Sequence, residues 1–455
     1  MSELTSGEVM DWVRTVVELG IRRPGFEAGA RAERWIARKL QELGVEDVRL
    51  EPVEVTRWEE GATHLELRGE GVPARVEAFP LPFSRSVRGV SGELALDDLD
   101  EGGDPTALSG KIALYSNRHA RVAVASLRDA RATHTYDPQG DFDRLLHTLP
   151  FGPRVQDVSG PAERAGARGF IGIVGQGWES CHYFVPYDGK RRDLPGVWIA
   201  PSPGGALLDA LRSGRRVEAT LSYETSHARV LSHNVIGTLP GAGSAWAIVG
   251  THHDAPFHGA VEDASGVALV LAQAWHWSRV PRHERPFHLL FLFNAGHMTG
   301  GAGLTAFLER HRGLVDRSAV AIHLEHAARE PCVEQGKLRA SDQVTPRWWF
   351  TSQIEPLEEA VGQALHREDL RRSLVLPPDA FFEIPPTDGG RLYPTGVPIV
   401  QLLAAPEYLF DIGDTLPMVH EESLLPITRA VVHVLHGLRG HSPAALRALD
   451  RGRSG

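Results

Sequence analysis

The stretch of sequence that decides the fold is Trp246-Ala-Ile-Val-Gly-Thr-His-His-Asp254, a short apolar run that ends in two histidines and an aspartate. Similar apolar runs follow at residues 287–293 and 318–325, and helical patterns separate the runs. Near-continuous apolar strands that alternate with helices are typical of parallel or mixed sheets covered on both faces. The sequence therefore predicts an α/β fold with a mixed, mostly parallel sheet flanked by helices.

The same alternation continues on both sides of this stretch. Apolar spacing predicts helices over residues 9–19, 30–43, 265–277, 302–312, 355–366 and 422–438, and strands over residues 46–56, 347–352 and 398–403. The turn Arg23-Pro24-Gly25 separates the first two predicted helices. The main domain is thus expected to begin with a pair of helices and to end on a helix.

The segment from Trp58 to Tyr223 differs in character from the rest of the chain. Its expected elements are strands over residues 110–115, 169–174 and 194–199, a helix over 203–213, and a long loop with one or two helical turns over 132–160. We therefore expect a discontinuous main domain, residues 1–57 and 230–445, interrupted by a β-rich α/β domain at residues 58–229. Residues 446–455 are expected to form a flexible tail.

Composition excludes several classes of function. The chain of 455 residues carries 48 lysines and arginines against 58 aspartates and glutamates, which argues against binding to nucleic acid or to a membrane surface. No apolar stretch reaches the roughly 18 residues that span a bilayer, and the N-terminal residues lack a signal-peptide pattern. We therefore expect a cytoplasmic protein with a small-molecule or peptide-like substrate, and the oligomeric state stays open.

Residues that bind divalent metals follow the predicted strands. The side chains concerned are His252, His253 and Asp254 after the first strand, His297 after the second, and His323, Glu325 and His326 at the end of the third. Glu262 and Asp263 stand just before a predicted helix. In open α/β sheets the active site lies beyond the carboxyl ends of the strands. Imidazole and carboxylate groups gathered there favour a site for zinc or a similar ion.

A structural role is the alternative for each single histidine. One buried histidine is more often a hydrogen-bonded core residue than a ligand, and strand alternation turns His323 and His326 to different faces. A glutamate just before a helix is commonly an N-terminal charge interaction. The set of ligating groups at successive strand ends nevertheless favours a metal site.

Several motifs occur in a fixed order along the chain. They are Arg23-Pro24-Gly25, Asn234-Val-Ile-Gly-Thr-Leu-Pro-Gly241, Gly250-Thr-His-His-Asp254, Gly259-Ala-Val-Glu-Asp-Ala-Ser-Gly266 and Thr387-Asp388 with Gly396-Val-Pro398. Within the insert stand Ser109-Gly-Lys-Ile-Ala-Leu114, Ala165-Gly-Ala-Arg-Gly169 and Leu194-Pro195. With these motifs the chain resembles, over nearly its whole length, the M28 metallopeptidases, which are zinc aminopeptidases, with an inserted protease-associated (PA) domain.

The resemblance implies a role for each matching residue. His252 matches the first histidine ligand, and Asp254 matches the aspartate that orients that histidine and supports catalysis. Glu262 falls on the aspartate that bridges two metal ions in the family, and Glu325 falls on the other aspartate ligand of the first ion. This ion would keep one nitrogen and two carboxylate ligands.

The second ion of the family is poorly matched. Where the family has Ala-Glu-Glu, this chain has Ala295-Gly296-His297, so Gly296 replaces the general base and His297 replaces a glutamate ligand. Loss of a positioned general base typically costs about 10²–10⁴-fold in rate. The family's last histidine ligand falls on Phe410, and a shift of one residue would offer Asp411 instead. Its Ser-Asp-His segment reads Thr387-Asp388-Gly389 here.

These departures lead to the expected site and function. We expect one zinc ion bound by His252, Glu262, Glu325 and His297, with His297 either a ligand or a catalytic imidazole. Further site candidates are His253, Asp263, His326, Asp388 and Asp411. The expected function is that of a metal-dependent hydrolase of the aminopeptidase type, acting on an amide or peptide-like small substrate. The alternatives are an inactive pseudoenzyme that binds or scaffolds, and non-hydrolytic amide chemistry such as cyclisation, rearrangement or transfer.

Overall fold

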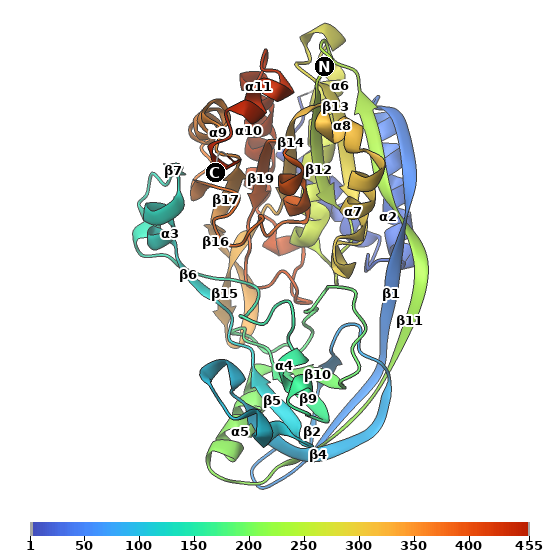
Figure 1. Ribbon diagram of the computed structural model, residues 1–455, viewed down its shortest axis with the longest axis vertical. Coiled ribbons are helices and arrows are strands. Elements are labelled where there is room, and N and C mark those ends of the chain that lie inside the picture. The colour runs from blue at the N-terminus through green and yellow to red at the C-terminus, as the bar shows by residue number, and fades with distance from the viewer. Residues whose placement is uncertain (1–2, 454–455) are drawn as a thin grey trace.

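One mixed sheet runs through the protein, and the computed structural model describes residues 3–453 (Figure 1). In its upper part the strand order is β11 (Glu218–Leu239), β13 (His288–Asn294), β12 (Trp246–His252), β14 (Ser318–Glu325), β19 (Ile399–Leu403), β17 (Arg347–Thr351) and β18 (Ser373–Leu376). β13, β12, β14 and β19 are parallel neighbours, whereas β11 and β17 join them in antiparallel pairs. The predicted mixed, mostly parallel sheet is confirmed.

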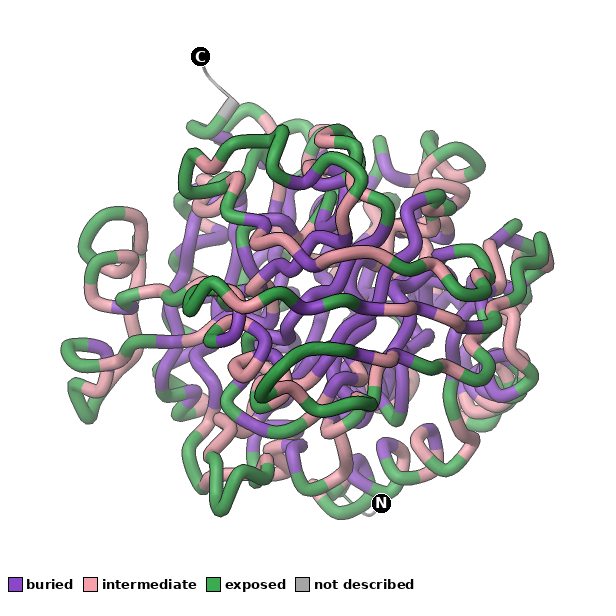
Figure 2. Tube along the Cα trace, turned by 90° about the horizontal axis from the view of Figure 1, so that it is seen from below, coloured by how far each residue is buried: buried purple, intermediate pink, exposed green. Residues whose placement is uncertain are grey.

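Helices cover both faces of this part of the sheet. They are α1 (Ser6–Glu18), α2 (Glu27–Glu42), α6 (Gly266–Arg279), α7 (Ala302–Arg310), α8 (Arg312–Asp316), α9 (Glu355–Arg367) and α10 (Leu424–Gly437). In β12, Ala247 and Val249 join the apolar cluster that includes α1, α6 and α10, whereas Ile248 joins a cluster with α7 and α8. Because both faces are buried, the central strands are continuously apolar rather than alternating. Figure 2 shows the buried residues gathered at the centre of the molecule.

A long antiparallel ribbon connects the upper part to a lower part. Strand β1 (Glu46–Arg68) pairs with β11 from Glu46 opposite Thr238 to Arg68 opposite Glu218. The boundaries expected at residues 57 and 230 therefore fall inside these two strands. The lower part continues the sheet through β4 (Val87–Asp97), β5 (Ile112–Ser116), β9 (Gly169–Ile173), β10 (Gly196–Ile199) and β3 (Ala78–Pro80), and it includes α5 (Pro201–Arg212). It has an apolar cluster of its own.

Residues 117–159, which we call the arm, leave the lower part and run back along the upper part (Figure 1). The arm contains β6 (Arg121–Ala123), α3 (Val124–Arg131), β7 (His134–Tyr136) and β8 (Leu146–Thr148), and β7 extends the main sheet by pairing with β18. Nδ1 of His147 lies 3.0 Å from a carboxylate oxygen of Glu330. The region 132–160, which was expected to be mainly a loop, therefore contains short strands and packs against the upper part of the molecule.

Two further segments differ from the sequence-based prediction. A hairpin of β15 (Arg329–Glu334) and β16 (Lys337–Val344) was not predicted, because its strands are polar and half-exposed and so lack an apolar run. Helix α11 (Pro443–Ala448) covers the start of the expected tail, and its Leu446 is buried. Arg451 forms an ion pair with Glu358 of α9. The last two residues of the expected tail, 454 and 455, lie outside the described residues.

Within the described part of the chain, no helix is both long enough and apolar enough to cross a bilayer.

The imidazole of His276 on α6 makes folding stability sensitive to acid. Its Nε2 is buried without a hydrogen-bond partner among the described residues. Burial, together with His436 and His433 on α10, lowers the pKa of His276 to about 4. An unfolded histidine has a pKa of about 6.5. The stability that neutral His276 contributes is therefore present above that pH and is lost as the pH falls toward the folded-state pKa.

We expect His276→Leu to flatten the pH dependence of the melting temperature between about pH 6.5 and pH 4. Thermal unfolding of both proteins across this range tests the expectation, and His283→Leu, on a side chain that is 81% exposed, is the matched control. Curves for wild type and His276→Leu that stay parallel throughout the range would contradict it.

Candidate metal centre

The carboxyl ends of β12, β13 and β14 meet at one edge of the sheet. His252 is the last residue of β12 and pairs in register with Asn294, the last residue of β13. Three residues after Asn294, His297 begins a short 3-10 turn, His297–Thr299. Glu325 ends β14. The parallel register of these strands brings the side chains predicted from the sequence to one place.

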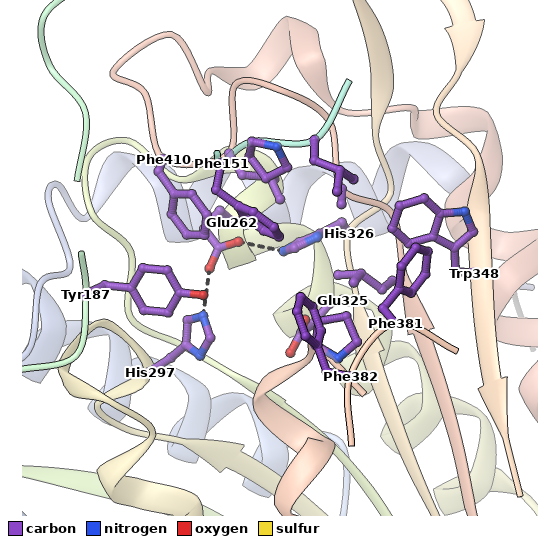
Figure 3. Close-up of a pocket in the computed structure, with 16 residues that line it drawn as sticks. Phe151, Tyr187, Glu262, His297, Glu325, His326, Trp348, Phe381, Phe382 and Phe410 are labelled. Atoms are coloured by element: carbon purple, nitrogen blue, oxygen red, sulfur yellow. Dashed lines mark ion pairs between the residues drawn. The ribbon is translucent and has the colours of Figure 1, made fainter. Parts of the chain in front are cut away.

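Glu262 lies at the centre of this edge, with imidazoles on both sides of its carboxylate. Its side chain is 2% exposed. Oε1 of Glu262 lies 3.1 Å from Nε2 of His252 and 3.6 Å from Nε2 of His297. Oε2 lies 2.8 Å from Nε2 of His326 (Figure 3). The rings of His252 and His297 stack with centroids 4.2 Å apart. Glu262 therefore connects the histidines of three different loops.

The hydrogen bonds behind the histidines determine what their Nε2 atoms can do. Nδ1 of His252 donates to the carbonyl of Asp254 at 3.0 Å, and Nδ1 of His326 donates to the carbonyl of Ala404 at 2.6 Å. A carbonyl only accepts, so Nδ1 carries the proton and Nε2 of a neutral ring presents a lone pair. These lone pairs face the carboxylate of Glu262, which also only accepts. Positive charge must therefore lie between them, supplied either by a second proton on the imidazole or by a bound metal ion.

The residues fit a divalent metal ion. Nε2 of His252, Oε1 of Glu262 and Nε2 of His326 are buried and have no hydrogen-bond partner among residues 3–453. Buried polar atoms without a partner are costly, so they mark a place where a ligand or ion belongs. The ligand atoms of His252, Glu262 and His297 all lie within 4.8 Å of one another. Imidazole nitrogen and carboxylate oxygen are the ligands that zinc takes in proteins.

Asp388 orients His297. Oδ1 of Asp388 lies 3.2 Å from Nδ1 of His297, and Oδ2 accepts from the side-chain amide of Asn294 at 2.8 Å. Burial opposes ionisation of Asp388, but His297 outweighs burial and lowers the pKa of this carboxyl. A carboxylate behind a ligating imidazole fixes the ring and increases its basicity. Asp388, named from the sequence as a candidate, thus belongs to the site as a support for a ligand.

Asp254 acts differently from the role that the resemblance implied. Its carboxylate was expected to orient His252, but Oδ1 lies 3.9 Å from Nδ1 of that ring. The carboxylate instead accepts from the backbone N–H groups of His297 at 3.1 Å and Met298 at 2.8 Å. Asp254 therefore holds His252 through its backbone carbonyl and holds the turn of His297 through its side chain.

Glu325 and Asp263 lie beside the centre but bind other groups. Oε1 of Glu325 lies 2.8 Å from Nε2 of His323 and accepts the backbone N–H of Asp388 at 2.8 Å. Asp263 accepts from the hydroxyl of Thr251 and from a backbone N–H, and burial raises its pKa to about 7. The predicted ligand Glu325 is thus hydrogen-bonded within the protein, whereas His326 takes the place next to Glu262.

His326 reaches the centre because the strand ends before it. Strand alternation predicted that His323 and His326 would point to different faces, but β14 stops at Glu325 and His326 has a left-handed φ of 74°. This turn directs the His326 ring to Glu262. Burial disfavours the charged imidazole, but Glu262 outweighs burial and raises the pKa of His326 to about 9. The place of His326 beside Glu262 therefore depends on a single backbone angle just beyond the strand, where alternation no longer applies.

Two candidates named from the sequence lie away from the centre. Nε2 of His253 lies 3.0 Å from the carbonyl of His233. The carboxylate of Asp411 accepts hydrogen bonds from the side chains of Gln176 at 3.1 Å and Trp178 at 3.3 Å, and these two residues lie in the loop after β9. Phe410, its neighbour, lines the pocket over the centre instead.

Two residues that the sequence did not single out hold the loop of Glu262. The carboxylate of Asp414 accepts the backbone N–H groups of Val261 and Glu262, both at 2.9 Å. The buried guanidinium of Arg22 donates to the carbonyls of Gly259 at 2.8 Å and His253 at 3.2 Å. Both act through the backbone of a distant segment, so no local pattern reveals them, although Arg22 adjoins the Arg23-Pro24-Gly25 motif.

An aromatic pocket of about 60 Å³ opens above Glu262 (Figure 3). Its apolar walls include Phe151 of the arm, Tyr187, Trp348, Phe381, Phe382 and Phe410. A wider cleft of about 390 Å³ adjoins it and shares Phe151, Tyr187, His297 and Phe382. The ring of Tyr187 stacks on Phe410 at 4.8 Å and lies 5.2 Å from the ring of His297. The polar centre is therefore the floor of an apolar pocket.

Comparison with known proteins identifies the fold. No protein-family model matches the sequence, and no curated protein matches it significantly. A peptidase M28 precursor from Shewanella amazonensis has a TM-score of 0.76 at 20% identity and covers 97% of this chain and 95% of its own. An aminopeptidase from Aneurinibacillus sp. strain AM-1 has a TM-score of 0.65 at 18% identity, and the match covers 96% of this chain and 94% of that protein. BSAP, a zinc aminopeptidase from Bacillus subtilis, has a TM-score of 0.67 at 17% identity, and the match covers 100% of this chain and 98% of BSAP.

These similarities extend along almost the full length of the chain. At such identities they show the fold alone, and the fold is that of the M28 peptidases. The expected M28-like architecture is confirmed.

We expect His252→Ala to lose the bound metal ion of the zinc-loaded protein, because the substitution removes one of the few nitrogen ligands of a compact site. Elemental analysis after zinc loading and gel filtration measures this loss. His258→Ala, on an exposed side chain of the same loop, is the matched control and should keep the wild-type metal content. Equal zinc content in His252→Ala and wild type would place the ion elsewhere.

Asp414→Asn should weaken metal affinity by roughly 10–100-fold without removing a ligand, because residues that position ligands typically contribute this much. The amide oxygen can replace only one of the two carboxylate acceptors that hold Val261 and Glu262. Competition with a chromophoric chelator gives the dissociation constant, and Asp342→Asn on the exposed β16 hairpin is the control. An unchanged dissociation constant would show that these N–H contacts do not position Glu262.

Proposed function

We propose that the protein is a metal-dependent hydrolase of the aminopeptidase type that acts on an amide or peptide-like small substrate. The observation that carries the proposal is the convergence of His252, Glu262 and His297 on the floor of an aromatic pocket, where buried atoms of His252 and Glu262 have no hydrogen-bond partner in the described part of the chain. These residues would hold one divalent ion, for which zinc is the best chemical fit. A bound zinc ion would supply Lewis-acid polarisation and lower the pKa of a water molecule.

The lining of the pocket favours a substrate that carries an apolar group next to the scissile amide. Its walls carry the aromatic rings of Tyr187, Phe381 and Phe410, while carboxylates and imidazoles of the lining lie at its floor. Burial raises the pKa of Tyr187, and the carboxylates of Glu262 and Glu325 raise it further. The phenol therefore keeps its proton and can donate a hydrogen bond to a carbonyl oxygen, where negative charge develops during amide hydrolysis.

Glu325 is our proposed proton acceptor. Gly296 offers no side chain at the position of the family's general base, whereas Glu325 lines the pocket beside Glu262 and His326. Burial favours the neutral acid, but His323 outweighs burial and lowers the pKa of Glu325. Glu325 is thus a carboxylate at neutral pH and can take a proton from water and return it to a leaving amine.

The lower part of the molecule and the arm fit a role in substrate access. We propose that the lower part is a PA-like domain, since it combines the five sheet strands β4, β5, β9, β10 and β3 with α5 and a separate apolar cluster at the place where the sequence motifs occur. The arm contributes Phe151 to the pocket wall, and the loop from the lower part contributes Tyr187. The insert would therefore shape the entrance for a small substrate.

The second candidate function is that of a pseudoenzyme that binds a ligand without turning it over. Gly296 is the observation in its favour, because a glycine cannot transfer protons. The two candidates differ in a direct way: the hydrolase turns over amides in the metal-loaded state, and the pseudoenzyme binds them unchanged. Identification of the products would also separate hydrolysis from cyclisation or transfer.

We expect the zinc-loaded protein to hydrolyse aminoacyl amides, with higher kcat/KM for leucyl and phenylalanyl than for glycyl substrates because of the apolar pocket. Glu325→Gln should lower kcat by about 10²–10⁴-fold while zinc remains bound. Glu334→Gln, on an exposed residue of β15, is the control. Activity that survives removal of metal by a chelator would contradict the hydrolase proposal, and full metal loading without turnover would support the pseudoenzyme.

A further inference from the structure

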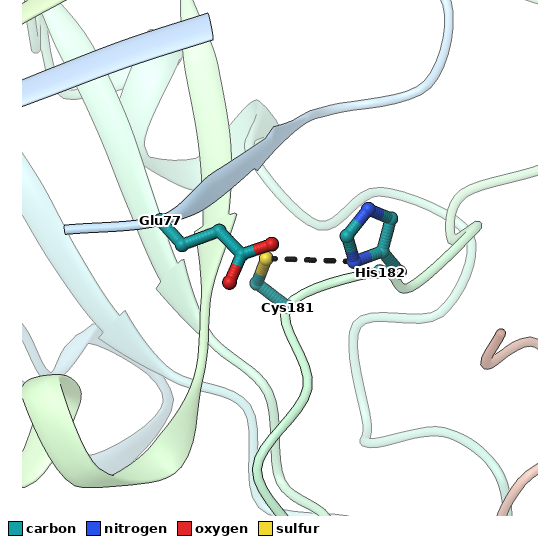
Figure 4. A group of neighbouring side chains, drawn as sticks. All are labelled: Glu77, Cys181 and His182. Atoms are coloured by element: carbon teal, nitrogen blue, oxygen red, sulfur yellow. Dashed lines mark hydrogen bonds between the residues drawn. The ribbon is translucent and has the colours of Figure 1, made fainter. Parts of the chain in front are cut away.

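Three side chains of different metal-binding types meet in the lower part of the molecule, outside the pocket (Figure 4). Glu77 stands just before β3, and Cys181 and His182 lie in the loop after β9. Their ligand atoms all lie within 4.8 Å of one another. The side chain of Glu77 is exposed, whereas Cys181 is buried. A thiol, an imidazole and a carboxylate thus share one partly open place.

The distance between the sulfur and the nitrogen suits a shared ion. Sγ of Cys181 lies 3.8 Å from Nδ1 of His182. In a tetrahedral zinc site with Zn–S of about 2.3 Å and Zn–N of about 2.1 Å, these two atoms would lie about 3.6 Å apart. Only a small adjustment is needed. We propose that Glu77, Cys181 and His182 form a second, peripheral site for zinc or a similar thiophilic divalent ion, with a solvent water as the remaining ligand.

The charge around the thiol favours a cation. Burial, together with the carboxylates of Glu77 and Asp411, raises the pKa of Cys181 to about 12. The thiol therefore keeps its proton at neutral pH when no ion is bound. When an M²⁺ ion binds, the sulfur–hydrogen bond breaks, a sulfur–metal bond forms, and one proton passes to solvent. No oxidant or reductant takes part in this exchange.

An ion at this place would fasten two segments that contribute to the pocket. It would link β3 to the loop that continues from Cys181 to Tyr187. The ring of His182 also packs against Phe79 at 5.4 Å and Phe257 at 6.1 Å, and Phe257 lies in the loop that follows Asp254. The peripheral ion thus has a structural role, in that it limits the motion of the loop that carries Tyr187.

Cobalt substitution tests the peripheral site in the full-length, reduced protein. Thiolate bound to Co²⁺ gives intense sulfur-to-metal charge-transfer absorption in the near ultraviolet, which nitrogen and oxygen ligands do not give. We expect this band on titration of wild type with Co²⁺. It should persist in Cys332→Ser, the matched control at the other cysteine, and disappear in Cys181→Ser. His252→Ala should keep the band, so failure of the proposed hydrolase would leave this result unchanged.

A variant at the exposed ligand keeps the test valid if Cys181→Ser does not fold. Glu77→Gln should retain the band but require roughly tenfold or more Co²⁺ to reach it, since even indirect ligand contacts contribute tenfold or more to affinity. The proposal is overturned if wild type shows no band with its thiols reduced, if the band survives Cys181→Ser, or if Glu77→Gln binds Co²⁺ as tightly as wild type.

Discussion

The site depends on the contacts between the buried carboxylate of Glu262 and the imidazoles on both sides of it. Nε2 of His252 and Nε2 of His326 face oxygens that can only accept, so the arrangement requires positive charge between them, from protonated imidazoles or from a bound metal ion. The protein fixes this carboxylate from behind, because Asp414 holds its backbone N–H and Arg22 holds the preceding loop. The first helices and the last loops of the chain thus converge on one side chain.

The fold explains why Glu262 and its histidine neighbours lie beside an aromatic pocket. Parallel strands deliver their polar residues to one edge of the sheet, and the edge would be open to water without further cover. The arm and the loop from the lower part provide that cover with Phe151 and Tyr187. An apolar enclosure strengthens every electrostatic interaction at its floor, which suits chemistry on an amide. The M28-like architecture therefore places the proposed ligands beneath an apolar cover.

Much of this could be predicted from the sequence, and the exceptions share a physical cause. Apolar runs that end in His252 or Glu325 reveal the strands and their polar ends, because burial on both faces demands continuous apolar residues. His326 was named only as a further candidate and not as a neighbour of Glu262, since its direction depends on one left-handed backbone angle. Asp414 was missed because it acts on backbone N–H groups 152 residues away. The polar β15–β16 hairpin has no apolar pattern to detect.

The central claim is that His252, Glu262 and His297 bind the same ion. An anomalous difference map at the zinc edge, from crystals of the zinc-loaded protein, tests this claim most directly. The account predicts a peak within bonding distance of Nε2 of His252, the carboxylate of Glu262 and Nε2 of His297. A fully loaded protein with no peak there, or with its peak bound to Glu325 and Asp263 but not to Glu262, would contradict it.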